Sequence, residues 1–134
     1  MQRLWSLAHA LQVRSKSMGK TLGVTGPQRL VIRIIGQMPQ ASARDVSNTL
    51  GMHPSTLTGI LARLEAQKMI ARTTDAVDRR VARLQLTRSG EKIDRERKGT
   101  VEAAVRRAMG RADAAVIADT MSMLEMLTSE LERG

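Results

Sequence analysis

Only two short segments of this sequence have the pattern of β-strands, and they limit any sheet to a single hairpin. The first segment is residues 69–73 and the second is residues 81–87. In the second segment Leu84 and Leu86 fall on one face and Arg83 on the other, which is the alternation of a half-buried strand. The sequence therefore predicts a mainly α fold with one small two-stranded β ribbon.

The rest of the chain has apolar residues at helical spacing, separated by capping signals. Pro27 suits the first turn of a helix, and Ser42 with Asp45 three residues later resembles a capping box. Gly51 permits the sharp turn that ends the helix begun at Ser42, and Thr87 is a suitable cap for a further helix. The predicted helices cover residues 2–18, a stretch from about Pro27 to Gly36, residues 42–50, a stretch within 53–69, a long helix from Thr87 through Ile93, Val101, Val105, Ala108 and Met109, and residues 111–132.

The composition excludes several classes of function. The 134 residues are enough for one domain and include no Cys, which rules out disulfides and thiolate sites and fits a reducing cytoplasm. His9 and His53 lack metal-site spacing, and "GKTLGVTG" lacks the order of a phosphate-binding loop. No apolar run approaches the roughly 18 residues that span a bilayer, and no signal peptide is apparent. We therefore expect a cytoplasmic protein that is not an enzyme and holds neither metal nor cofactor.

The whole chain has a formal net charge of +9, and its positive charge is concentrated in the first three quarters. Residues 1–25 carry four basic and no acidic side chains, and residues 26–99 carry fourteen basic and seven acidic. Residues 100–134 carry four basic and six acidic side chains. A net positive field attracts polyanions, so nucleic acid is the first expected partner, ahead of an anionic membrane surface.

The order of the predicted elements favours DNA. A short helix at 42–50, a turn at Gly51 and a second helix from His53 have the arrangement of a helix-turn-helix, whose second helix lies in the major groove. Many proteins that never bind DNA contain such a pair. A ribbon tipped with Arg79 and Arg80 follows immediately, and it is suited to the narrow, negative minor groove.

These segments resemble the MarR (multiple antibiotic resistance regulator) family of winged-helix transcription factors. The resemblance is carried by "GPQRLVIRII", "SARDVSNTLGMHPSTLTGILARLEAQKMI", "DRRVARLQLT" and the "LTRSG" that opens the next helix. It implies a homodimer that binds palindromic double-stranded DNA and often responds to a small ligand. It also implies dimerisation helices at residues 1–25 and 100–134 around a winged helix-turn-helix lobe at 26–99. The apolar last helix, with its Met121, Met123 and Met126 cluster, favours a dimer independently.

The wing residues have distinct predicted roles. Arg80 matches the wing-tip arginine of the family, and its guanidinium suits the minor groove because it is weakly hydrated and always charged. Arg79 is either a phosphate contact or solvated. Asp78 is predicted to fix the shape of the ribbon by pairing with Arg72 or Arg80. Arg83 is expected on a solvated face, as is Arg44.

The start of the second helix supplies the other predicted contacts. Hydroxyl groups there can bond bases or phosphates, and a Thr methyl can meet a thymine methyl. The residues predicted to face DNA are Pro54, Ser55, Thr56 and Thr58, with Arg63 one turn later as a phosphate contact or a solvated side chain. His53 either caps the helix, contacts phosphate or points into water. Gly59 departs from the family, in which a longer polar side chain is common there.

The sequence as a whole predicts a ligand-responsive repressor, with alternatives left open. The effector would be a small anionic or aromatic molecule, for which Arg29, Arg33 or Trp5 are candidate contacts. The alternative function is a non-catalytic interaction or RNA-binding module that uses the winged-helix fold.

Overall fold

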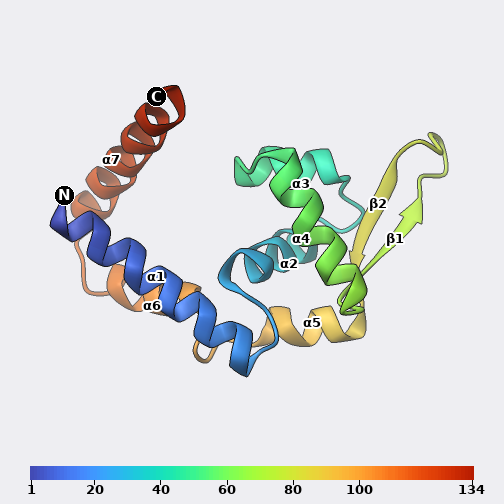
Figure 1. Cartoon of the computed structure of the whole chain (residues 1–134), viewed down its shortest axis with the longest axis horizontal. Coiled ribbons are helices and arrows are strands. Elements are labelled where there is room, and N and C mark those ends of the chain that lie inside the picture. Colours follow the sequence, from blue (N-terminus) through green and yellow to red (C-terminus); the bar gives the residue numbers. More distant parts are fainter. The chain divides into compact units, whose positions relative to one another are not determined.

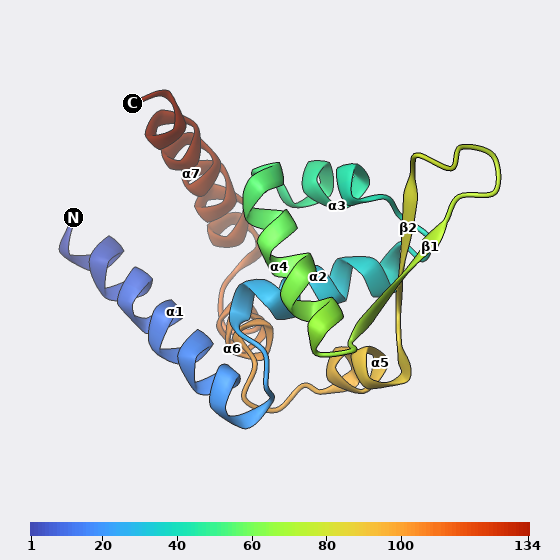
Figure 2. The same ribbon diagram turned by 45° about the vertical axis from the view of Figure 1, so that its right-hand side comes forward.

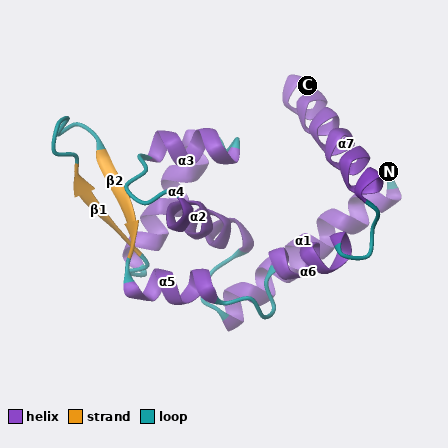
Figure 3. Cartoon of the chain, turned by 180° about the vertical axis from the view of Figure 1, so that it is seen from behind, coloured by secondary structure: helices purple, strands orange, loops and turns teal.

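The computed structural model describes all 134 residues, as seven helices and one two-stranded antiparallel sheet (Figures 1 and 3). The elements are α1 (Gln2–Thr21), α2 (Gly26–Gln37), α3 (Ala43–Leu50), α4 (Pro54–Ala66), β1 (Ile70–Thr74), β2 (Ala82–Leu86), α5 (Arg88–Arg95), α6 (Val101–Met109) and α7 (Ala114–Arg133). The mainly α fold with a small β wing is thereby confirmed. The chain divides into two units, residues 1–100 and 101–134. No helix combines the length and the apolar character that a membrane span requires.

The predicted capping signals fix where the helices begin. Thr25 and Gln28 form a capping box at the start of α2. Ser42 and Asp45 form a second one, in which the Asp45 carboxylate accepts the Ser42 backbone N–H at 2.8 Å. This bond and the Ser42 hydroxyl hold the pKa of Asp45 below its ordinary value. Gly51 then ends α3 in the left-handed conformation, with a φ of 60°, which turns the chain into α4.

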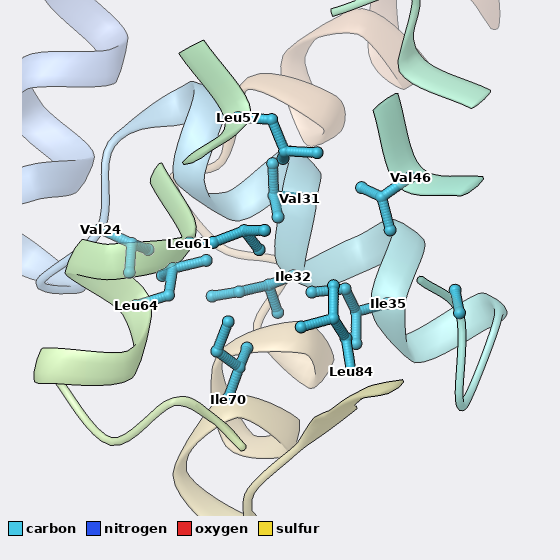
Figure 4. Packing of buried hydrophobic residues seen from close by; sticks show 11 residues of the cluster. Val24, Val31, Ile32, Ile35, Val46, Leu57, Leu61, Leu64, Ile70 and Leu84 are labelled. Carbon is cyan, nitrogen blue, oxygen red and sulfur yellow. The ribbon is translucent and has the colours of Figure 1, made fainter. Parts of the chain in front are cut away.

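The hydrophobic core is built around α2, as Figure 4 shows, and it holds α4 and the wing in place. Val31, Ile32 and Ile35 of α2 are buried and face a leucine stripe on α4. Leu84 of β2 is completely buried against the same cluster, which is worth about 1.5–3 kcal/mol for a side chain of this size. The buried cluster comprises Val24, Val31, Ile32, Ile35, Ala41, Val46, Leu57, Leu61, Leu64, Ile70 and Leu84.

The two strands pair from Ile70 opposite Leu86 to Thr74 opposite Ala82, and both strands lie within one residue of their predicted bounds. Two further contacts attach the hairpin to the lobe. Leu84 donates its backbone N–H to the Ala41 carbonyl at 2.9 Å and accepts from the Gln40 N–H at 3.0 Å. The wing is therefore anchored through its backbone as well as through its apolar side chains.

The turn from β2 into α5 requires a glycine. Thr87 donates its backbone N–H to the Met69 carbonyl at 3.0 Å and its hydroxyl to the Lys68 carbonyl at 2.6 Å. This brings Gly90 so close that a Cβ atom there would lie 2.0 Å from the Met69 carbonyl oxygen. Gly90 therefore permits a backbone approach that no other residue allows.

The long helix predicted after Thr87 is wrong, because the chain forms two helices, α5 and α6, separated by residues 96–100. Arg29, which is 1% exposed, donates to the carbonyls of Ile93, Asp94 and Glu96 at the end of α5. The Glu96 carboxylate accepts the N–H groups of the next residues, Arg97 and Lys98, which also lowers its pKa. Gly99 then adopts a φ of 75°, so the helix cannot continue.

The predicted N-terminal helix is three residues too short. It continues through Gly19 to Thr21, because Met18 is fully buried and its carbonyl accepts the Leu22 N–H at 2.8 Å. Residues 19–21, which were predicted to lie beyond this helix, are thus helical.

Candidate nucleic-acid interface

The start of α4 presents a polar surface supported from behind by the core. His53, Pro54, Ser55, Thr56 and Thr58 are exposed, as is Arg63 one turn later. Leu57, Leu61 and Leu64, on the opposite face of the same helix, are buried. Burial of this leucine stripe therefore fixes which side chains of α4 face outward.

Hydrogen bonds within α4 already occupy part of this polar surface. Of the three roles considered for His53, the structure shows capping, since its Nδ1 accepts the Ser55 N–H at 3.2 Å and lies 2.7 Å from the Ser55 hydroxyl. Thr58 donates its hydroxyl to the Pro54 carbonyl at 2.9 Å, which leaves the oxygen able to accept. A Cβ atom on Gly59 would meet nothing within 4 Å, so the middle of this surface is open.

The second part of the surface is the wing-tip loop, residues 75–81, which extends beyond α3 and α4 (Figures 1 and 2). Its side chains from Ala76 to Arg80 are exposed. The guanidinium groups of Arg79 and Arg80 make no hydrogen bond or ion pair within the protein. Their charge is therefore available to an outside partner.

Asp75, for which no role was predicted from the sequence, organises this loop. One carboxylate oxygen accepts the N–H groups of Val77 at 2.9 Å and Asp78 at 2.8 Å. The Asp75 backbone N–H donates to the Val81 carbonyl at 3.0 Å, which closes the loop. An aspartate whose side chain accepts N–H groups two and three residues later is typical of an Asx turn. The presence of an Asp at the start of the loop was the signal in the sequence that could have indicated this role.

Asp75 also connects the loop to the body of the lobe through Arg83. Its second carboxylate oxygen lies 2.6 Å from the Arg83 Nε. Arg83 in turn lies 4.0 Å from the Asp45 carboxylate of α3 and 3.5 Å from the Gln40 carbonyl. The Asp78 N–H, the Arg83 side chain and the Val77 N–H together lower the pKa of Asp75 to about 2. The prediction of a solvated face for Arg83 is therefore wrong, and its side chain instead holds the wing.

Asp78 makes a different contact from the one predicted. Its carboxylate accepts the backbone N–H of Arg80 at 3.0 Å, and it forms no ion pair with Arg72 or Arg80. Arg72 pairs instead with Glu65 of α4 at 2.8 Å. The contact of Asp78 acts on the backbone that carries Arg80, and the Arg80 guanidinium stays unpaired.

The start of α4 and the wing-tip loop lie on one side of the lobe, together with α3, while α5 lies on the opposite side (Figures 1, 2 and 3). A surface of this kind, with short polar groups on a helix and two unpaired arginines on a ribbon, matches what duplex DNA offers in its major and minor grooves.

The candidate effector contacts on α2 are engaged by the protein itself. Arg29 is buried and donates to the carbonyls at the end of α5. Arg33 pairs with Asp94 of α5 at 3.1 Å. Trp5 on α1 is 70% exposed. An anionic ligand would have to displace these carbonyls or Asp94 to reach either arginine.

Comparison with known proteins finds similar chains over most of this length. The model of the MarR family matches residues 22–81, which run from the turn before α2 to the wing-tip loop. The HTH-type transcriptional regulator FarR of Neisseria gonorrhoeae is 26% identical over 125 residues, covering 91% of this chain and 86% of FarR. The HTH-type transcriptional repressor Rv2887 of Mycobacterium tuberculosis is 27% identical over 109 residues, covering 81% of this chain and 78% of the repressor.

Solved structures share the fold along nearly the whole chain. The crystal structure of Streptococcus pneumoniae FabT in complex with DNA has a TM-score of 0.73 and 27% sequence identity, and covers 98% of this chain and 94% of FabT. Rv2887 has itself been solved in complex with salicylic acid, with a TM-score of 0.58, 24% identity and coverage of 92% of each chain.

Proposed function

Because this chain belongs to the MarR family of transcriptional regulators, we propose that it binds a palindromic double-stranded DNA site as a homodimer and represses transcription by occupying a promoter. The start of α4 would enter the major groove, and the wing-tip loop would reach the adjacent minor groove. The similar FabT has been crystallised with DNA, and the similar Rv2887 is a repressor.

One observation carries this proposal: the exposed start of α4 and the unpaired arginines of the wing-tip loop lie on the same side of one lobe. Arg80 is the residue we assign to the minor groove, where a weakly hydrated guanidinium is favoured. Ser55, Thr56 and Thr58 are assigned to base edges or phosphates, and Arg63 to a phosphate.

Dimerisation through the terminal helices is supported by the apolar side chains that they expose. These are Leu4, Trp5, Leu7, Leu11 and Val13 on α1, and Val116, Met121, Met123, Leu124, Met126, Leu127 and Leu131 on α7. Covering such faces with a second copy would remove apolar area from water, at roughly 25 cal/mol per Å². A two-fold dimer would set the two α4 helices about 34 Å apart, one turn of the duplex.

We further propose a small anionic effector with an aromatic ring, since the similar Rv2887 has been solved with salicylic acid. Its carboxylate would take the place of Asp94 at Arg33, or of the α5 carbonyls at Arg29. Salicylate should then raise the melting temperature and weaken DNA binding, and Arg33→Gln should reduce both responses. A melting temperature that does not respond to salicylate would argue against this effector.

The DNA-binding proposal is tested by selecting bound duplexes from a random library. The expected product is a palindrome with half-site centres about one helical turn apart. Titrations in a gel-shift assay should then rank the selected duplex above a shuffled duplex and above RNA of the same sequence. Equal affinity for all three would favour the RNA-binding or interaction module instead.

A further inference from the structure

Val77, in the wing-tip loop, is the most exposed large apolar side chain of the molecule, at 96%. Almost all other exposed large apolar residues lie on α1, α6 and α7, and only Leu30, at 39%, shares the winged-helix lobe with Val77. A dimer through the terminal helices would cover the exposed apolar residues of α1, α6 and α7. Such a dimer does not explain an exposed valine at the end of the wing.

The loop holds the backbone of Val77 in a fixed position. The Val77 N–H donates to Asp75 at 2.9 Å, and Asp75 is held in turn by Arg83 at 2.6 Å. The Val81 N–H donates to the Asp78 carbonyl at 3.0 Å and tightens the same loop. An exposed side chain on a rigid loop keeps its apolar surface available to a partner, with little ordering left to do on binding.

The same loop carries Arg79 and Arg80, whose guanidinium groups are unpaired, so a partner that meets these arginines meets Val77 as well. Under the proposed function that partner is the minor groove. Its floor presents only acceptors at A·T pairs, whereas each G·C pair adds the N2 amino donor of guanine. An apolar side chain placed against this amino group leaves the donor without a partner, which disfavours binding.

We propose that Val77 is a specificity-determining residue, which biases the base pairs under the wing toward A·T by rejecting the minor-groove amino group of guanine. This inference rests on the proposed DNA binding and deepens it. Arg80 supplies attraction to the groove, and Val77 supplies the discrimination between base pairs. Sequence is thereby read at positions that α4 does not contact.

The test keeps the selected half-site cores constant and changes the flanking pairs that the wing covers. Inosine·C pairs remove the guanine amino group while keeping the major-groove face of inosine like that of guanine, and diaminopurine·T pairs add an amino group to A·T. We expect the wild-type protein to bind inosine·C flanks roughly tenfold more tightly than G·C flanks, and A·T flanks similarly more tightly than diaminopurine·T flanks.

The decisive variant is Val77→Thr, which has the same shape but carries a hydroxyl that can accept from the amino group. The side chain is almost fully exposed, so the melting temperature should stay unchanged. The preference for inosine should fall below about threefold in Val77→Thr and persist in Arg80→Ala, despite the weaker overall binding of the latter.

Two results would overturn the inference while leaving the proposed function intact. One is equal affinity of the wild-type protein for inosine·C flanks and G·C flanks. The other is an undiminished preference for inosine in Val77→Thr, which would assign the discrimination to groove width. A protein that does not prefer the selected duplex over RNA would instead fail the proposed function, and the inference with it.

Discussion

The start of α4 and the wing-tip loop project from the same side of the lobe, but they are held in place by different forces. Behind α4 lies a buried stripe that includes Leu57 and Leu61, so the helix is oriented by apolar packing. The wing-tip loop has no such support at its tip. It is shaped by hydrogen bonds to Asp75 and by the ion pair of that residue with Arg83.

This difference assigns different sensitivities to the two regions. A helix oriented by buried leucines keeps its geometry over a wide range of salt and pH, because apolar burial involves no charge. A loop organised by a carboxylate depends on the ionisation of that group, and under the proposed function its arginines would attract DNA through charges that salt screens. We expect α4 to determine which half-site is bound and the wing to determine most of the affinity and its salt dependence.

The largest expected effect lies at the base of the wing. Gly90→Ala places a methyl group 2.0 Å from the Met69 carbonyl oxygen, and should lower the free energy of unfolding by roughly 2–4 kcal/mol. Gly59→Ala in α4 is the matched control, because its methyl group meets nothing within 4 Å. The control should stabilise the protein by up to about 1 kcal/mol through higher helix propensity. Urea denaturation followed by circular dichroism measures the free energy of unfolding of both variants. Equal stability of Gly90→Ala and Gly59→Ala would contradict the close contact assigned to Gly90.

The next effect concerns affinity alone. Arg80→Ala should weaken binding to the selected duplex by about tenfold to a hundredfold, with fold and dimer intact, because its guanidinium is exposed and unpaired. Arg95→Ala on α5, on the opposite side of the lobe, removes an exposed arginine that pairs with Glu91 at 3.2 Å, and should change affinity by less than about twofold. A gel-shift titration in which the two variants behave alike would show that the wing holds no special position on DNA.

The sequence predicted most of the fold because local signals and buried patterns agreed. The capping pair of Ser42 and Asp45, the turn at Gly51 and the strand around the buried Leu84 each depend on signals that act over a few residues, and each appears in the structure where expected. The break after α5 was missed because it depends on Arg29, which lies more than sixty residues away in the sequence. A contact between distant segments leaves no periodic signal.

The charged residues of the wing were harder to assign, for a related reason. The sequence shows Asp75, Asp78 and Arg83 within a short span, and any pairing among them and Arg72 or Arg80 is compatible with the spacing. The path of the loop decides which oxygen meets which donor. In this loop the Asp75 carboxylate pairs with Arg83, and the Asp78 carboxylate accepts the Arg80 backbone N–H. Which of the outward-facing residues touch DNA stays a prediction.

A smaller effect is expected when the charge at the centre of the loop is removed. Asp75→Asn keeps an oxygen acceptor for the N–H groups of Val77 and Asp78 but loses the ion pair with Arg83. The pKa of Asp75 falls from its ordinary 3.8 to about 2 in the folded protein. A lowered folded-state pKa gives stability that is complete above the ordinary value and is lost as the pH falls through about 2.

Wild-type protein should therefore be more stable than Asp75→Asn by a constant amount near neutral pH, and the difference should shrink as the pH falls from about 4 toward 2. Urea denaturation at a series of pH values measures it. Asp113→Asn is a suitable control, because that carboxylate makes no side-chain cap bond to α7. A stability difference that does not change with pH would show that the Asp75 carboxylate does not hold the wing.

The smallest expected effect is that of Arg79, for which a phosphate contact and a solvated side chain predict different salt dependences. If its guanidinium neutralises one phosphate, Arg79→Ala should reduce the slope of log affinity against log salt by about 0.9, and should do so equally on selected and shuffled duplexes. Arg80→Ala should instead lower the affinity for the selected duplex more than that for the shuffled one. A solvated Arg79 leaves the slopes on the selected and the shuffled duplex unchanged, and in that case Arg80 is the one arginine of the wing-tip loop that contacts DNA. Titrations between about 50 and 200 mM salt distinguish the two outcomes, because log affinity falls linearly with log salt and the loss of one phosphate contact appears as a change of slope.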